Sequence, residues 1–271
     1  MIDLHCHLLP GLDDGAKDLP TSLRMAKIAA DDGIETIVCT PHILPGVYNN
    51  SGPEIVKAVE RLQHAIANAG IPIRLMAGAD VHIAPNLSAH LRSGQALPIN
   101  GSRYFLLEPP HHVLPPRMDD HVFGLQAAGF APILTHPERL TWIENNYALV
   151  KRLVRSGVLL QITAGAVLGR FGSRPKYWAD RILDEGMCHL LATDAHDPER
   201  RPPIMSKARD AIARRLGDDE ALNLVYRRPK IVVENLPAGQ MPPLPEPIAD
   251  GEDRQKMSFF AGMLKRVRSA R

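Results

Sequence analysis

Short apolar stretches rich in β-branched residues alternate along this chain with longer amphipathic stretches. The apolar stretches have the length of β-strands and occupy residues 1–5, 35–40, 71–78, 103–108, 131–136, 158–163 and 188–194. Between them, apolar residues recur at helical spacing, and the stretches at 19–33, 54–70 and 147–157 end in glycine, where helices commonly stop. The pattern predicts strands and helices in strict alternation.

Near-continuous apolar strands separated by helices are typical of a parallel sheet that is buried on both faces. Both a barrel and a doubly wound open sheet have this pattern. The chain has no G-x-G-x-x-G turn of the kind that opens a dinucleotide-binding sheet, which favours the barrel. We therefore expect an α/β fold, a distorted (β/α)7 barrel of the TIM type.

The composition changes after residue 236, so we expect the barrel to span residues 1–236. Residues 237–255 are rich in proline and are predicted to form a linker. Residues 256–271 place apolar side chains on one helical face and basic side chains elsewhere. This pattern is typical of peripheral contact with an anionic membrane surface, but a helix that packs on the barrel or on a second subunit of a homo-oligomer has the same pattern.

Charge and cysteine content limit the function classes. A formal net charge of +2 gives no electrostatic reason to expect nucleic acid as a partner. The three cysteines, Cys6, Cys39 and Cys188, are far apart and form no C-x-x-C pair, which indicates a reducing compartment. We expect neither a secretory leader nor a membrane-spanning helix, and hence a cytoplasmic protein.

Metal-ligand side chains follow most of the predicted strands. In a β/α barrel the loops at the carboxyl ends of the strands build the active site. Six of the seven strand ends offer an imidazole or a carboxylate, in chain order His5 and His7, His42, Asp80, Glu108, His136, and Asp194 with His196. This mixture of ligands is what a cluster of two or three divalent ions requires, so we predict a multinuclear metal site.

The first seventeen residues bring two ligand-bearing segments together. His5 and His7 are two residues apart, so on an extended strand both rings point the same way and can meet one ion. Pro10 and Gly11 allow a turn after the strand, which would bring the carboxylate of Asp14 to a further ion.

Two arginines, Arg139 and Arg201, stand close to predicted ligands, with Arg200 as a competitor for the second position. Guanidinium groups match phosphate oxygens in geometry and charge, so arginines beside a metal cluster indicate phosphate-ester chemistry. A cysteine-based phosphatase is excluded, because no cysteine of this chain is followed six positions later by arginine.

The chain resembles the PHP (polymerase and histidinol phosphatase) superfamily, and more closely its bacterial tyrosine-protein phosphatase branch of the CpsB/CapC/YwqE type. The resemblance rests on an ordered set of motifs across residues 1–235: DLHCHLLPGLDDGAKD, CTPHILPGVY, LLEPP, THPERL, QITAGAVLGRFG and TDAHDPERRPP. It implies a site for three divalent ions, with manganese favoured and iron, zinc and magnesium as alternatives. It also implies phosphotyrosine hydrolysis on the tail of a bacterial tyrosine kinase that regulates capsular or exopolysaccharide biosynthesis.

The same resemblance implies how the ligands divide among the ions. His5, His7, Glu108 and Asp194 would hold the first ion, Asp80, Glu108 and His136 the second, and Asp14, His42 and His196 the third. Arg139 and Arg201 would bind the phosphate. The branch usually has glutamate at the third strand, where this chain has Asp80.

Two other functions fit the same residues. One is a small-molecule phosphatase of the superfamily, such as one that acts on histidinol phosphate. The other is a regulator that binds the kinase tail without cleaving it. His82, His111 and His112 lie close in sequence to predicted ligands and could support the ligands, line the substrate groove or lie on the surface.

Overall fold

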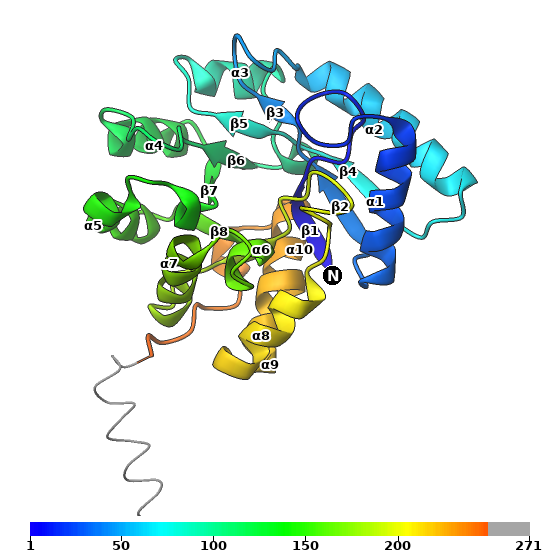
Figure 1. Ribbon diagram of the computed structural model, residues 1–271. Helices are drawn as coiled ribbons and strands as arrows, with labels where there is room; N and C mark the ends of the chain where they lie inside the picture. The colour runs from blue at the N-terminus through cyan, green and yellow to red at the C-terminus, as the bar shows by residue number, and fades with distance from the viewer. Residues whose placement is uncertain (249–271) are drawn as a thin grey trace, which may run out of the picture.

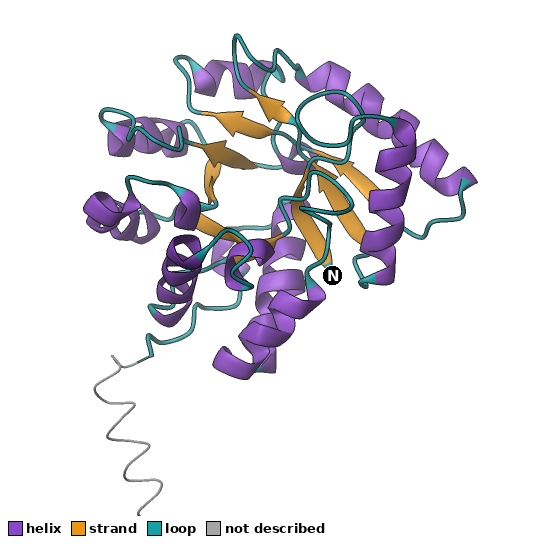
Figure 2. Cartoon of the chain, in the orientation of Figure 1, coloured by secondary structure: helices purple, strands orange, loops and turns teal. Residues whose placement is uncertain are grey.

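The computed structural model describes residues 1–248, in which parallel strands form a ring and helices surround it (Figures 1 and 2). The strands are β1 (Ile2–Cys6), β2 (Thr36–Cys39), β3 (His42–Ile43), β4 (Arg74–Ala77), β5 (Asp80–His82), β6 (Tyr104–Glu108), β7 (Ala131–Thr135), β8 (Leu159–Thr163) and β9 (Leu190–Ala192). The α-helices are α1 (Leu19–Asp31), α2 (Gly52–Asn68), α3 (Leu87–Ser93), α4 (Met118–Ala127), α5 (Ile143–Arg155), α6 (Ala164–Val167), α7 (Ser173–Asp184), α8 (Ser206–Leu216), α9 (Asp218–Leu222) and α10 (Arg228–Val233). Shorter helical segments are η1 (Ile99–Gly101), η2 (Pro137–Arg139), η3 (Asn223–Arg227) and η4 (Ala238–Gln240).

The strands pair in parallel in two sheets, with the orders β1-β2-β4 and β3-β5-β6-β7-β8-β9. Strands β2 and β3 are segments of one interrupted strand, because only two residues separate them, and the same holds for β4 and β5. The edge strands β1 and β9 meet where Cys6 bridges to Ala195, and the His7 N–H donates to the Ala195 carbonyl at 2.9 Å. The result is the distorted (β/α)7 barrel that the alternating pattern predicts.

Inward-facing side chains change from apolar to polar along each strand. Tyr104 and Leu106 of β6 belong to the apolar cluster inside the barrel, and so does Leu190 of β9. Alternate residues of a strand share one face, so the inward row of β6 ends in Glu108 and that of β9 continues to Asp194. The strands therefore deliver ligands to the carboxyl end of the barrel and apolar packing to its other end.

Strand β1 aims its two histidines inward through an irregularity. Leu4 belongs to the interior cluster, but the register with β2 shifts between Asp3 and Cys6, and the Cys6 side chain packs outside the barrel. A bulge of this kind re-aims the side chains that follow it. It leaves His5 and His7 on the barrel interior, which strict alternation from Leu4 would not.

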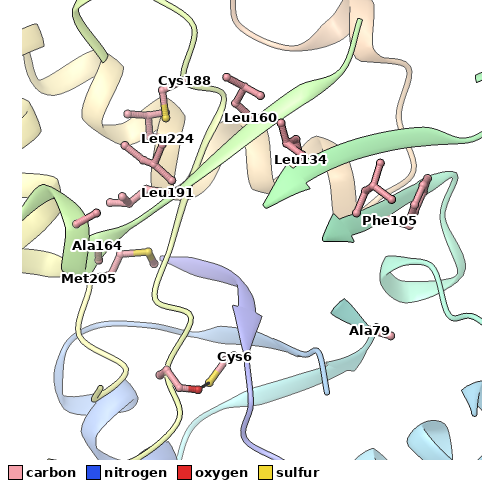
Figure 3. Packing of buried hydrophobic residues seen from close by; sticks show 14 of the residues in the cluster. Cys6, Ala79, Phe105, Leu134, Leu160, Ala164, Cys188, Leu191, Met205 and Leu224 are labelled. Carbon is pink, nitrogen blue, oxygen red and sulfur yellow. Dashed lines mark hydrogen bonds between the residues drawn. The ribbon is translucent and has the colours of Figure 1, made fainter. Parts of the chain in front are cut away.

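The outward faces of the strands pack against the helices in the larger apolar cluster. Figure 3 shows Phe105, Leu134, Leu160 and Leu191 from four successive strands in this layer. The predicted strand–helix alternation thus buries both faces of the sheet. Within residues 1–248, the structure contains no helix with the length and apolar character that a membrane span requires.

The described part of the proline-rich segment, residues 237–248, contacts the barrel. Arg228 of α10 donates hydrogen bonds to the carbonyls of Pro242 and Pro243 at 3.1 and 2.7 Å, and the Ile248 N–H donates to the Asp184 carbonyl at 2.7 Å. The rest of the predicted linker and the amphipathic tail predicted at 256–271 lie outside the described residues.

Candidate metal centre

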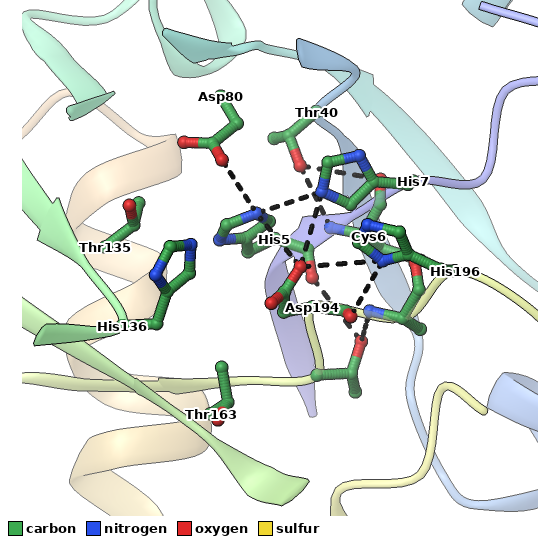
Figure 4. A network of polar contacts seen from close by, with 12 residues as sticks. His5, Cys6, His7, Thr40, Asp80, Thr135, His136, Thr163, Asp194 and His196 are labelled. Carbon is green, nitrogen blue, oxygen red and sulfur yellow. Dashed lines mark hydrogen bonds and ion pairs between the residues drawn. The ribbon is translucent and has the colours of Figure 1, made fainter. Parts of the chain in front are cut away.

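His5 lies at the centre of a buried polar cluster at the carboxyl end of the barrel (Figure 4). Its Nε2 atom is 3.1 Å from His7 Nε2 and 3.4 Å from an oxygen of both Asp80 and Asp194. The Nε2 of His7 is also 3.4 Å from Asp194 Oδ1. Two ligands of one ion at bond lengths of about 2.1 Å lie roughly 3.0–3.4 Å apart, so these separations fit a shared cation.

Hydrogen bonds on the far side of three rings fix the imidazole orientation. The Nδ1–H of His5 donates to the Gln161 side-chain carbonyl at 2.9 Å, and the Nδ1–H of His7 donates to Asp13 at 2.6 Å. The Nδ1–H of His196 donates to the Asp194 backbone carbonyl at 3.0 Å. With the proton on Nδ1, the Nε2 atom of each ring has a lone pair for a metal ion. Metal-binding histidines are usually held by a hydrogen bond from the other ring nitrogen in this way.

A second group of ligands forms around Asp14, in the turn that follows β1. Its Oδ1 atom lies 3.5 Å from the Nε2 atoms of both His42 and His196. His7 joins them, and one ligand atom from each of the four lies within 4.8 Å of the others. Tyr48 stacks on the ring of His42 with the centroids 5.5 Å apart. The predicted turn therefore brings Asp14 over the strand ends.

Four histidines surround the carboxylate of Glu108. Oε2 lies 2.5 Å from His82 Nε2 and 3.1 Å from His42 Nδ1. Oε1 lies 3.5 Å from His136 Nε2 and 3.6 Å from His111 Nε2. Among the described residues, Glu108 belongs to two groups that could hold an ion, one with His42 and His82 and the other with His111 and His136.

Asp80 shows most directly that the site fits cations. Its side chain is fully buried, and neither carboxylate oxygen has a hydrogen-bond partner within residues 1–248. Unpaired buried carboxylates are costly, and bound cations would compensate them.

Two ligand residues have left-handed backbone conformations. His136 follows β7 with φ 33°, and Asp194 follows β9 with φ 50°. Such conformations cost about 1–3 kcal/mol in residues other than glycine and gather at functional sites. Here they turn the chain at the strand end so that both side chains enter the cluster.

Asp194 joins the imidazole cluster to the two predicted phosphate-binding arginines. Its Oδ1 faces His5 and His7, whereas its Oδ2 pairs with Nη1 of Arg139 and with Nη2 of Arg201, the latter at 2.5 Å. The guanidinium carbons lie 4.8 and 5.8 Å from the ring centroid of Phe171. Arg200, the competitor for the second position, is exposed.

The protonation states of three ligands suit cation binding, whereas those of three others require a cation to displace a proton. Burial opposes ionisation of Asp194, but His5 and Arg201 outweigh it and hold the Asp194 pKa well below its usual value. Burial and a neighbouring arginine hold the pKa of His136 well below the usual value, and burial lowers the pKa of His196 to about 4. Burial opposes protonation of His5 and His7, but the neighbouring carboxylates outweigh it and raise the pKa of both, that of His7 to about 10, and burial raises the pKa of Asp80. Anionic carboxylates and neutral imidazoles are the forms that bind metal ions.

The structure brings all nine predicted ligands and both predicted arginines into one region. Within residues 1–248 the ligands fall into five overlapping groups, two of which also contain His82 or His111. The predicted third set recurs, because Asp14, His42 and His196 group together with His7. The predicted first set of His5, His7, Glu108 and Asp194 does not recur as one group, and neither does the trio of Asp80, Glu108 and His136. Asp80 instead groups with His5 and His7.

Sequence reasoning assigned no role to Asp13, Gln161 and Phe171, and left His82 and His111 open. Asp13 was visible as the neighbour of Asp14. The position of Gln161 on β8, two residues after an inward apolar residue, was its only signal. Phe171 lies in the stretch QITAGAVLGRFG, whose residue types indicate no particular chemistry.

The cysteines offer no nucleophile. Cys6, Cys39 and Cys188 are buried, and burial raises the pKa of each thiol above its usual value. No group in the described chain that could hold a metal contains a cysteine. The exclusion of a cysteine-based mechanism from the sequence agrees with this geometry.

Curated relatives carry phosphatase names. The chain is 32% identical to tyrosine-protein phosphatase YwqE of Bacillus subtilis (strain 168) over 245 residues, which cover 90% of this chain and 96% of the relative. It is 30% identical to the putative tyrosine-protein phosphatase CapC of Staphylococcus aureus, over 76% of this chain and 81% of the relative. Tyrosine-protein phosphatase CpsB of Streptococcus pneumoniae is 26% identical over 87% of this chain.

Solved structures agree in fold. A crystal structure from work on YwqE of Bacillus subtilis and CpsB of Streptococcus pneumoniae, described as unique metal-dependent tyrosine phosphatases, matches with a TM-score of 0.85 and 32% identity, covering 90% of this chain and 99% of that chain. Histidinol phosphate phosphatase of Lactococcus lactis shares the fold at 14% identity with a TM-score of 0.53, covering 83% of this chain and 94% of that chain.

The family model described as "Capsular polysaccharide synthesis, CpsB/CapC" matches residues 1–234, almost the whole described chain. The resemblance inferred from the ordered motifs is thereby confirmed. The chain belongs to the CpsB/CapC family.

Proposed function

We propose that this protein is a metal-dependent protein-tyrosine phosphatase. One observation carries the proposal: Asp194 faces a cluster of imidazoles with one oxygen and two arginines with the other. Cation ligands and phosphate-binding groups therefore adjoin each other, as a phosphomonoesterase requires. The names of the relatives support phosphotyrosine as the substrate.

The residues that would hold cations are His5, His7, Asp14, His42, Asp80, Glu108, His136, Asp194 and His196. Bound divalent cations supply Lewis acidity, which polarises a phosphoryl oxygen and makes water a stronger nucleophile near neutral pH. A set of imidazoles and carboxylates without thiolates suits manganese, which we favour, as well as iron or zinc. We infer three ions from the number of ligands.

Arg139 and Arg201 would bind the phosphoryl oxygens and stabilise the charge that develops on them. Their pairing with Asp194 holds both side chains in place before substrate arrives. A phosphate monoester would enter between these arginines and the ligand cluster. Only the phosphoryl group need reach the buried residues.

A cleft beside the cluster supports an aromatic substrate. It has a volume of about 210 Å³ and is lined by Ile43, Tyr48, Val81 and His82, among others. The apolar side chains and the Tyr48 ring offer contacts to a tyrosyl ring. The family description names capsular polysaccharide synthesis, and the relatives are named tyrosine-protein phosphatases. From these we infer that the phosphoprotein partner is a tyrosine kinase of capsule or exopolysaccharide synthesis.

The test uses the full chain loaded with Mn²⁺. Phosphate release is measured from a phosphotyrosine peptide, from the same peptide with phosphoserine, and from histidinol phosphate. We expect turnover of the phosphotyrosine peptide, loss of turnover with a chelator, and recovery on adding Mn²⁺.

Faster turnover of histidinol phosphate would favour the small-molecule phosphatase instead. Binding of the phosphotyrosine peptide without phosphate release, while a known tyrosine phosphatase cleaves it in the same assay, would favour the regulator. Either result contradicts the proposed function.

A further inference from the structure

Asp80 occupies a different place relative to Glu108 than the family resemblance implies, and His111, whose role the resemblance leaves open, lies beside Glu108. Asp80 Oδ2 lies 3.4 Å from His5 Nε2 and 3.4 Å from His42 Nδ1. The group that contains Glu108 and His136 has His111, and not Asp80, as its third member. The short aspartate side chain thus leaves a ligand position that an imidazole from a neighbouring loop can fill.

One oxygen of Glu108 faces both imidazoles of this group. Oε1 lies 3.5 Å from His136 Nε2 and 3.6 Å from His111 Nε2, and the two ring centroids are 5.2 Å apart. Each separation is slightly longer than a hydrogen bond and close to the distance between two ligands of one ion. A carboxylate oxygen beside two imidazoles is a donor set that divalent ions take.

The loop that carries His111 is held by hydrogen bonds. The His111 carbonyl accepts from the backbone N–H of Thr141 at 2.9 Å and from the Thr141 hydroxyl at 3.1 Å. The indole N–H of Trp142 donates to the Pro110 carbonyl at 2.9 Å. These bonds tie the loop after β6 to the chain after β7, which carries His136. His111 and His136 are therefore positioned against each other.

The exposure of the group leaves room for solvent or substrate. The His136 side chain is almost fully buried at 2% exposure, whereas that of His111 is 31% exposed. Three protein ligands with one side open to solvent are typical of a catalytic metal position. A structural site would be enclosed by four protein ligands.

We propose that His111 is a metal ligand, which together with Glu108 and His136 completes one cation site at the mouth of the barrel. Asp80 then serves the cation held by His5 and His7. This inference rests on the metal dependence in the proposed function, but not on phosphotyrosine as the substrate. The ligand set of this ion has two nitrogen atoms and one oxygen atom, which suits manganese, iron or zinc.

The test measures metal binding without substrate. The full-length protein is stripped with a chelator and titrated with Mn²⁺, and the free ion is followed by electron paramagnetic resonance; a parallel titration uses Zn²⁺. Loss of a residue that only supports a metal ligand typically weakens metal binding 10–100-fold. Since His111 would itself be a ligand, we expect His111→Ala to weaken one binding step by at least that factor. The remaining steps should keep their wild-type affinities.

His112→Ala is the matched control. His112 is the next residue and is exposed; its Nδ1 lies 3.5 Å from the Thr141 hydroxyl and its ring centroid 6.3 Å from that of His111. Within residues 1–248 it belongs to no group that could hold an ion. The His112→Ala variant should bind the wild-type number of ions with unchanged affinity. His111→Gln, which keeps most of the side-chain volume, should lose the same step as His111→Ala, and circular dichroism should show wild-type helix content in both.

The proposal is overturned if His111→Ala binds Mn²⁺ and Zn²⁺ with the wild-type number and affinities. It is also overturned if Asp80→Asn removes the step that His136→Ala removes while His111→Ala leaves that step intact. If His111→Ala loses an ion but the wild-type protein does not release phosphate from phosphotyrosine, the proposed substrate fails and the metal assignment stands.

Discussion

Gly165 lies directly against the aromatic ring of Phe171, since a Cβ atom on the glycine would be 2.8 Å from Cε2 of that ring. The same ring lies under the guanidinium groups of Arg139 and Arg201. The glycine therefore sets where the ring can lie, and the ring helps to hold two like charges side by side.

Gly165→Ala should move the ring and reduce activity. Gly165 belongs to α6 and has no positive φ, so alanine suits the backbone and the added methyl displaces the Phe171 side chain. Each cation–π contact contributes about 0.5–1 kcal/mol at a partly exposed site. We expect kcat/KM for the phosphotyrosine peptide to fall about tenfold through a higher KM, with bound metal and Tm unchanged.

Gly124→Ala provides the control, because Gly124 also lies in a helix and an added Cβ would meet no atom within 4 Å. It should keep wild-type kinetics. The double variant Gly165→Ala/Phe171→Leu should be no less active than Phe171→Leu alone. Additive losses would show that Gly165 acts by some route other than the ring.

The order of the strands and the ligands they carry could be predicted from the sequence because both follow from local patterns. Parallel strands end at one edge, so a ligand type after each apolar stretch predicts one shared site. Glu108 and Asp194 show this, since each continues an inward-facing row of its own strand. The confirmed family resemblance required no contact information either.

Contacts that depend on loop packing could not be predicted. Gln161 orients His5 across the barrel, at a separation of 156 residues. Phe171 reaches the arginines only because the turn after β8 folds back on Gly165. Likewise, the choice between Asp80 and His111 beside Glu108 depends on side-chain length and on hydrogen bonds to the loop after β6, which no periodicity records.

Arg139→Ala should weaken transition-state stabilisation by about 2–4 kcal/mol, the usual weight of one preorganised contact to a developing negative charge. Arg139 pairs with Asp194 and stacks near Phe171, so its guanidinium is already in place before substrate binds. Steady-state kinetics on the phosphotyrosine peptide give the loss in kcat/KM. Arg139→Lys should recover only part of it, because an ammonium lacks the planar fork.

Arg201→Ala should cause a loss of the same order, whereas Arg200→Ala should have no effect. Arg200 is exposed, and in the described contacts only its backbone N–H is engaged, by Asp197. The two neighbouring variants therefore separate phosphate binding from general surface charge. Equal losses in both would count against the role of Arg201.

A buried ion pair lies at the end of the barrel opposite the metal centre. Nη1 and Nη2 of Arg228 donate to Glu220 at 2.6 and 2.9 Å, and the Arg228 side chain is fully buried. Removing one partner of such a pair typically costs about 3–5 kcal/mol. Arg228→Leu should lower the free energy of unfolding in urea by that amount while kcat of the folded protein stays unchanged.

The double variant Glu220→Leu/Arg228→Leu should be more stable than Arg228→Leu, because it leaves no unpaired buried carboxylate. Urea titrations of the three proteins give the comparison. If the double variant is the less stable, the other contacts of Glu220, such as the hydrogen bond from Asn223 at 2.9 Å, contribute more than its unpaired charge costs.

His189 should make the protein less stable in mild acid. Burial, with the nearby charge of Arg228, lowers the pKa of His189 from 6.5 to about 4, and its Nδ1 accepts a hydrogen bond from the Leu160 N–H at 3.1 Å. The unfolded chain therefore binds a proton at higher pH than the folded chain does. The contribution of neutral His189 to the free energy of unfolding is fully present at pH values above its unfolded pKa near 6.5. This contribution is lost as the pH falls towards 4.

His189→Asn removes this titration and keeps an acceptor near the position of Nδ1. At about 1.4 kcal/mol for each pH unit, the folded wild type should lose at most roughly 3 kcal/mol relative to the variant between pH 6.5 and 4. Thermal unfolding in chelator, followed by circular dichroism, compares the two proteins at each pH, and the titrating ligand histidines are common to both. The wild-type Tm should fall more steeply below pH 6.5, whereas parallel curves would mean that His189 is protonated equally readily in the folded and unfolded chains.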